Sequence, residues 1–199
     1  MNRAFSPAFE GLIRSYLCKL TFSVKQEAEM VTKSGKPSVA VVMGSKSDYE
    51  TMENAVQVLN DFGLDCETRV ISAHRTPDVA SEFAGGAKER GLKVIIAAAG
   101  KAAHLAGVMA AHTPIPVIGV PMKTSDLGGL DSLLSTVQMP GGVPVATTAI
   151  GRAGAKNAAL LAVQMLSLSD DDLAQRLDDY RRDMADNVRK ADEEIRGGS

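Results

Sequence analysis

Five short apolar runs alternate with segments of helical periodicity, and this alternation constrains the fold more than any other feature of the chain. The apolar runs are predicted strands at residues 39–43, 66–71, 94–97, 116–120 and 145–149. Between them, apolar residues recur three or four positions apart, which is typical of helices packed on one face. Such a repeat requires parallel strands joined by helical crossovers. We therefore predict an α/β, flavodoxin-like three-layer sandwich with a five-stranded parallel sheet.

The helices between the predicted strands are indicated by their spacing and by the signals at their ends. Gly63 ends the first helix, because glycine readily takes the left-handed cap conformation. Thr76 as N-cap and Pro77 at the first helical position begin the second helix, which we expect to run to about Arg90. The predicted helices span residues 52–62, 77–90, 102–111, 130–137 and 155–166.

Two segments flank the predicted flavodoxin-like catalytic domain, which we place at residues 36–169. Residues 1–35 are an amphipathic or disordered extension, and targeting, docking and an unstructured leader all remain open for it. Residues 170–199 form a long helix and tail with one narrow apolar stripe. We expect that stripe to pack on a neighbouring subunit, with the helix's own domain as the alternative.

Charge and cysteine content exclude several classes of function. The 22 Lys and Arg residues nearly balance 24 Asp and Glu residues, so the net charge of -2 disfavours nucleic acid as a partner. Cys18 and Cys66 form no CxxC pair, which argues against a zinc site or a disulfide framework. No apolar run is long enough to cross a bilayer. We expect a soluble, cytoplasmic protein with no metal and no membrane partner.

Polar residues follow the first predicted strand, and ligands bind beyond the carboxyl ends of the strands in such sheets. The turn holds Ser45, Ser47 and Asp48 at the start of a helix. Hydroxyls and free backbone N–H groups at that position suit an anion, while an ionised aspartate suits ribose hydroxyls. The alternative is that Ser47 or Asp48 only caps the helix.

The loop after the second predicted strand contains Ser72, His74 and Arg75. Imidazole, with a pKa of about 6.5, both takes and gives a proton at neutral pH. Arginine binds phosphate through two parallel hydrogen bonds. We therefore expect His74 to be catalytic and Arg75 to bind an anion.

The loop after the third predicted strand, Gly100 to His104, is ambiguous. Its small residues allow close approach of a ligand to the backbone, but His104 also fits an ordinary helix residue. The later loops Pro121–Gly129 and Gln138–Val143 lack an evident acid or base, and we expect them to act as walls or lids. Neither GxxxxGK[ST] nor GxGxxG follows the first strand, so no nucleotide cofactor is predicted.

Taken together, these motifs resemble the N5-carboxyaminoimidazole ribonucleotide mutase family of purine biosynthesis. The resemblance covers about residues 38–183 and its motifs occur in the expected order: GSKSD at 44–48, SAHRTP at 72–77, AAHLAG at 102–107, SLLSTVQMPGGVPVAT at 132–147 and AIGRAGAKNAALLA at 149–162.

The resemblance implies an isomerase that needs no cofactor and works as a homo-octamer. It implies that carboxylate leaves nitrogen as CO2, stays trapped, and is captured at C4 to give 4-carboxy-5-aminoimidazole ribonucleotide. His74 would then be the proton carrier. Ser45, Ser47 and Arg75 would hold the phosphate and Asp48 the ribose hydroxyls. Gly100, Lys101 and His104 would line the pocket for CO2 and the carboxylate, and Ser72 would be a further substrate-binding residue.

One departure from the family pattern concerns Lys101, which stands where the family usually has glycine. The lysine adds a long cation that either binds the carboxylate or obstructs the site, and it does not adopt a positive φ comfortably. Two alternatives to the mutase therefore stay open. The first is a carboxylase that adds free CO2 to aminoimidazole ribonucleotide, and the second is a catalytically silent phosphoribosyl-binding subunit.

Overall fold

A five-stranded parallel sheet forms the centre of the protein in the computed structural model, which describes residues 36–197. The strand order is β2-β1-β3-β4-β5 and every neighbouring pair is parallel. This is the order of flavodoxin-like doubly wound sheets, so the predicted fold class is confirmed. The strands are β1 (Val39–Met43), β2 (Cys66–Val70), β3 (Val94–Ala99), β4 (Val117–Pro121) and β5 (Ala146–Thr147).

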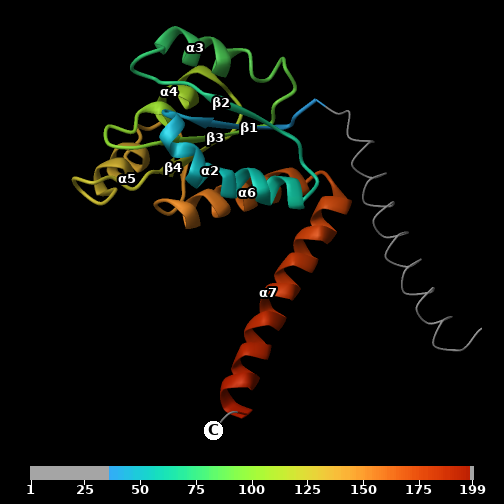
Figure 1. Cartoon of the computed structure of the whole chain (residues 1–199). Coiled ribbons are helices and arrows are strands. Elements are labelled where there is room, and N and C mark those ends of the chain that lie inside the picture. Colours follow the sequence, from blue (N-terminus) through green and yellow to red (C-terminus); the bar gives the residue numbers. More distant parts are fainter. Residues whose placement is uncertain (1–35, 198–199) are drawn as a thin grey trace, which may run out of the picture. The chain divides into compact units, whose positions relative to one another are not determined.

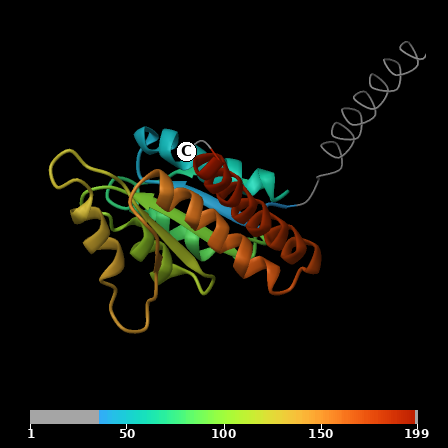
Figure 2. The ribbon, with the colours of Figure 1, turned by 90° about the horizontal axis from the view of Figure 1, so that it is seen from below.

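Helices cover both faces of the sheet, as Figure 1 shows, with α3 and α4 on one face and α2 and α6 on the other. Helix α5 packs beside β4, and α7 follows α6 (Figure 2). A short 3-10 turn, η1, precedes α2. The bounds are η1 (Lys46–Asp48), α2 (Tyr49–Asp61), α3 (Pro77–Gly85), α4 (Leu105–His112), α5 (Leu130–Val137), α6 (Arg152–Ser167) and α7 (Asp171–Gly197).

Strand β1 shows why a continuous apolar run belongs at the centre of such a sheet. All five of its residues are fully buried. Val39, Val41 and Met43 join the core under α2 and α6, whereas Ala40 and Val42 join the core under α3 and α4. Alternate side chains point to opposite faces of a strand, so a strand covered on both sides must be apolar throughout.

Several predicted boundaries were wrong, and the second and third crossover helices and the last strand are examples. Helix α3 ends at Gly85 rather than near Arg90, whose guanidinium donates to the Phe83 carbonyl at 3.0 Å and so satisfies the helix end. Helix α4 begins at Leu105 because the preceding residues form a turn. The last strand pairs only over Ala146–Thr147.

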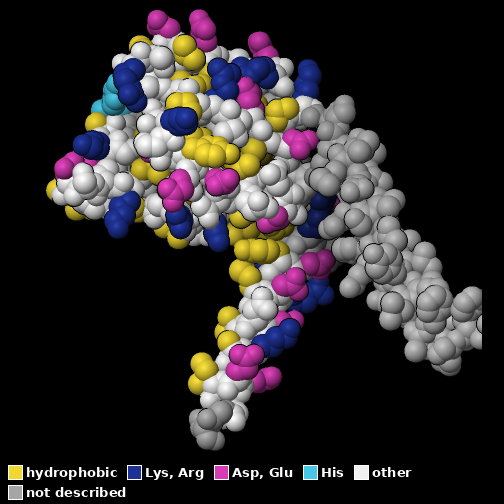
Figure 3. All heavy atoms as spheres, viewed as in Figure 1, with side chains coloured by type: hydrophobic (Ala, Val, Ile, Leu, Met, Phe, Trp, Pro, Cys, Tyr) yellow, Lys and Arg dark blue, Asp and Glu magenta, His cyan; other side chains and the backbone are white. Residues whose placement is uncertain are grey.

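Helix α7 packs on its own domain only near its start. Asp170 accepts a hydrogen bond from the Leu173 backbone N–H at 2.9 Å and caps the helix, and Leu173 is buried. The Tyr180 ring lies 5.5 Å from that of Phe62. Further along, Met184 and other apolar side chains are exposed, and in Figure 3 yellow apolar atoms extend along this helix. The amphipathic segment predicted before residue 36 lies outside the described residues.

Candidate active site

One pocket of about 600 Å³ lies beyond the carboxyl ends of β1, β2, β3 and β4. Its lining comes from the four loops at 44–48, 72–75, 99–105 and 122–125. We call it the strand-end pocket. The structure brings all nine predicted site residues to its lining: Ser45, Ser47, Asp48, Ser72, His74, Arg75, Gly100, Lys101 and His104. A pocket of this volume accommodates a small ligand.

The first loop is organised by a capping box around η1. Ser45 Oγ accepts from the Ser47 backbone N–H at 3.3 Å, and Asp48 Oδ2 accepts from the Ser45 backbone N–H at 3.1 Å. These two N–H groups are therefore occupied, contrary to the expectation of free ones. The Ser47 hydroxyl donates to Ser45 Oγ at 2.9 Å, so both hydroxyls face the same part of the pocket.

Asp48 is half-buried, and desolvation raises the pKa of its carboxyl although the hydrogen bond from Ser45 lowers it. The charged form is thus held in the pocket at some cost in free energy. A carboxylate with accepting capacity left over is suited to hydroxyl donors, as ribose provides.

The second loop joins the ends of β1 and β2 through Arg75. Its backbone N–H and its Nε donate to Ser72 Oγ at 3.2 and 3.3 Å, and its Nη2 donates to the Gly44 carbonyl at 3.0 Å. Ser72 therefore orients the guanidinium. The rest of the guanidinium fork remains for an anion in the pocket.

Two histidines from different loops meet in the strand-end pocket. His74 Nε2 and His104 Nδ1 lie 2.8 Å apart, and their rings meet edge to face with centroids 4.9 Å apart. One ring nitrogen donates to the other, so the contact links the positions of their protons. Both rings are exposed in the single chain. Histidine atoms are visible at this end in Figure 3, close to cationic side chains.

The third loop contains the left-handed residue Lys101, with φ of 58°. Its backbone N–H donates to the buried Ser132 hydroxyl at 2.9 Å, and Ser135 donates to its carbonyl at 3.4 Å. The ammonium pairs with Asp126 at 3.1 Å and holds the pKa of that carboxyl below its ordinary value. Lys101 is therefore fastened to α5 and to the loop before it.

The fourth loop was expected to be a wall without an acid or base. It does line the pocket, through Met122, Lys123, Thr124 and Ser125, but Lys123 and Asp126 give it charges that the sequence reading overlooked. The signal was available in the sequence: β4 lies next to β3 in this fold, so its loop must share their edge. The other expected wall, Gln138–Val143, is not part of the lining.

The groups in the pocket suit an anionic ligand that also carries hydroxyl groups. Arg75, Lys101 and Lys123 supply positive charge, and the serines and Asp48 supply hydrogen bonds. Within residues 36–197, no cluster of three or more His, Cys, Asp or Glu side chains is arranged to hold a metal ion.

A family model described as AIR carboxylase matches residues 38–187, which include the whole strand-end pocket. The chain belongs to the AIR carboxylase family. All four loops of the pocket and most of α7 fall within the match.

Two curated relatives are similar to this chain over nearly their full length. N5-carboxyaminoimidazole ribonucleotide mutase of Bacillus subtilis is 55% identical over 160 residues, which is 80% of this chain and 99% of the relative. The mutase of Escherichia coli is 52% identical over 159 residues, 80% of this chain and 94% of the relative.

The fold is shared with solved structures of PurE proteins. The crystal structure of PurE from Treponema denticola matches with a TM-score of 0.71 and 28% identity, covering 80% of this chain and 98% of that one. The S38D variant of PurE2 from the same organism matches with a TM-score of 0.72. The fold of this chain is therefore similar to the folds of these two PurE proteins.

Proposed function

We propose that this protein is an isomerase that interconverts N5-carboxyaminoimidazole ribonucleotide and 4-carboxy-5-aminoimidazole ribonucleotide in purine biosynthesis. The supporting observation is the histidine pair in the strand-end pocket, with His74 and His104 2.8 Å apart beside a loop that suits a sugar phosphate. The relatives named as this mutase share more than half of the aligned residues.

The substrate is held through its phosphate and through its ribose hydroxyls. Arg75 and the two hydroxyls of the first loop, from Ser45 and Ser47, bind the phosphate. The Asp48 carboxylate accepts hydrogen bonds from the ribose hydroxyls. The ring then lies toward the histidine pair and the loop from Gly100, where the carboxyl group is exchanged.

His74 carries one proton through the reaction, so its protonation is restored at the end. It gives the proton to the exocyclic nitrogen as the bond from that nitrogen to the carboxyl carbon breaks and CO2 forms. The C4 carbon then bonds to CO2, and the proton that C4 loses returns to His74. His104 holds the ring of His74 through their hydrogen bond.

The experiment that tests this function is to incubate the purified protein with N5-carboxyaminoimidazole ribonucleotide and to follow the ultraviolet spectrum of the product. Formation of 4-carboxy-5-aminoimidazole ribonucleotide without added bicarbonate supports the mutase. If the protein converts only aminoimidazole ribonucleotide, and only when bicarbonate is added, it is instead the carboxylase, the activity after which the family model is described. Binding without any turnover would identify a silent subunit.

We also propose that the enzyme works as a cytoplasmic homo-octamer in which α7 packs on a neighbouring subunit. The exposed apolar residues Met184 and Val188 of α7 support such a contact.

None of the helices within residues 36–197 is long and apolar enough to cross a membrane. The family match starts at residue 38, which supports treating residues 1–35 as an extension to the catalytic domain. Light scattering on the full-length protein as it elutes from a size-exclusion column measures the subunit number, and we expect eight.

A further inference from the structure

Three cationic residues line the strand-end pocket, and they differ in how far their charge is already used. Arg75 donates to Ser72 and to the Gly44 carbonyl. Lys101 forms an ion pair with Asp126. Lys123 makes no hydrogen bond or ion pair with any residue in the part of the chain that the structure describes, and it is exposed. Lys123 is therefore the cation with its full charge available to a ligand.

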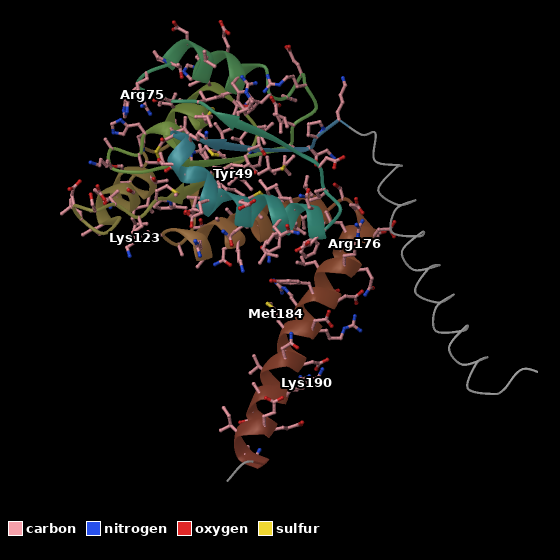
Figure 4. The ribbon with its side chains drawn as sticks, in the orientation of Figure 1. Tyr49, Arg75, Lys123, Arg176, Met184 and Lys190 are labelled. Atoms are coloured by element: carbon pink, nitrogen blue, oxygen red, sulfur yellow. The ribbon has the colours of Figure 1, made fainter. Side chains whose placement is uncertain are left out.

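These cations form two separate groups because of the strand order. Arg75 follows β2 and Lys123 follows β4, with β1 and β3 between them. Three strand spacings amount to about 14 Å across the sheet. Figure 4 shows Arg75 and Lys123 at the same end of the domain but on opposite sides of it. Lys101, which follows β3, lies on the side of Lys123.

The substrate of the proposed function carries two anionic groups, a phosphate and a carboxylate, separated by the ribose and the ring. With the phosphate at Arg75, the carboxylate extends toward the β3 and β4 loops. These two loops carry Lys101, Lys123 and Asp126, and their net charge is positive because Asp126 offsets only one lysine. Exposed ion pairs are weak and are exchanged easily with a competing anion.

We propose that Lys123 determines specificity for the carboxylate of the substrate, and that Asp126 limits this recognition by holding Lys101. The assignment rests on the proposed function, because it takes the phosphate to lie at Arg75. It also gives Lys101 a role other than the two predicted from the sequence, which were binding of the carboxylate and obstruction of the site. In the free protein the ammonium of Lys101 is paired with Asp126 at 3.1 Å, although the residue also lines the pocket.

The test compares two ligands that differ only in the carboxyl group: 4-carboxy-5-aminoimidazole ribonucleotide and aminoimidazole ribonucleotide. Calorimetry on the full-length protein gives the Kd of each ligand. The Kd of aminoimidazole ribonucleotide divided by the Kd of 4-carboxy-5-aminoimidazole ribonucleotide measures discrimination in favour of the carboxylate. K123Q should lower that ratio by a factor of about 1.4 to 5 through weaker binding of the carboxylated ligand alone, because an exposed ion pair contributes about 0.2 to 1 kcal/mol. D126N should raise the ratio, because it frees Lys101.

The matched control is K93Q, which removes an exposed lysine just before β3, at the opposite end of the sheet, and should keep the wild-type ratio. In turnover assays K123Q should raise KM for N5-carboxyaminoimidazole ribonucleotide and largely retain kcat. Equal weakening of both ligands by K123Q, or an unchanged ratio, would overturn the assignment while leaving the mutase intact. Failure of the wild-type protein to bind either ribonucleotide would overturn the proposed function itself.

Discussion

Replacing His74 by asparagine tests proton transfer with little disturbance of the fold. The ring is exposed and its hydrogen bond is to one partner, His104, so the free energy of unfolding should change by less than about 1 kcal/mol. Loss of a general acid and base typically slows a reaction about 10²- to 10⁴-fold, equivalent to about 2.7 to 5.4 kcal/mol in the barrier. Rate and stability should therefore respond very differently.

His104 provides the internal comparison. If it acts on the reaction only through its 2.8 Å contact with His74, then His104→Asn removes one hydrogen bond, which contributes about 0.5 to 1.5 kcal/mol. The rate should fall only about two- to twelvefold. The two variants thus separate the proton carrier from the residue that positions it.

The assay is the spectral interconversion of the two carboxylated ribonucleotides, measured in both directions, with binding of the product followed by calorimetry. His74→Asn should bind the product with nearly wild-type affinity and fail to convert it. A rate within tenfold of wild type would remove His74 from the mechanism. A larger loss in His104→Asn than in His74→Asn would reverse the two roles.

Three further substitutions test features of the loops. Asp48→Asn should weaken ribonucleotide binding, yet at neutral pH its free energy of unfolding should be at least that of wild type. Burial raises the pKa of the Asp48 carboxyl, so this stability advantage of the variant should shrink as the pH falls toward the ordinary aspartate range. Denaturant titrations at several pH values measure the difference. Lys101→Gly should be about 0.5 to 1 kcal/mol more stable than Lys101→Ala, because only glycine takes a φ of 58° without strain; the reverse order in denaturant unfolding would contradict that backbone geometry. Gly154→Ala should destabilise the protein by about 3 kcal/mol or more, because the added Cβ would lie 1.6 Å from the Ala149 carbonyl oxygen. Thermal unfolding measures the loss, with Gly141→Ala as the neutral control, since a Cβ at Gly141 would meet nothing within 4 Å. Equal melting temperatures for the two variants would refute the close approach.

The fold was predictable because its main signal is local. An apolar run such as Val39–Met43 indicates a strand buried on both faces wherever it occurs, and five such runs separated by helices leave few topologies. The element ends were less predictable because they depend on distant contacts. The start of α4 is one case, since the turn before Leu105 is fixed by hydrogen bonds from residue 101 to α5.

The candidate site was predictable in its members but not in its contacts. Each polar loop residue was recognisable from its place after a strand, and the topology then brought the loops to one pocket. The pairing of His74 with His104 spans 30 positions, and no local pattern encodes it. The same holds for Lys101 and Asp126, whose pairing depends on the side-by-side placement of β3 and β4.

The exposure of both histidine rings has a consequence for the gas released during the reaction. In the proposed mechanism CO2 forms beside rings that face solvent in the single chain and has an open route into bulk water, so a lone subunit would lose part of its intermediate on every cycle. Isotope-labelled bicarbonate in the medium should consequently enter the product of a dissociated form faster than that of the proposed octamer. The rate of label uptake then tests whether neighbouring chains close the cavity in the proposed assembly.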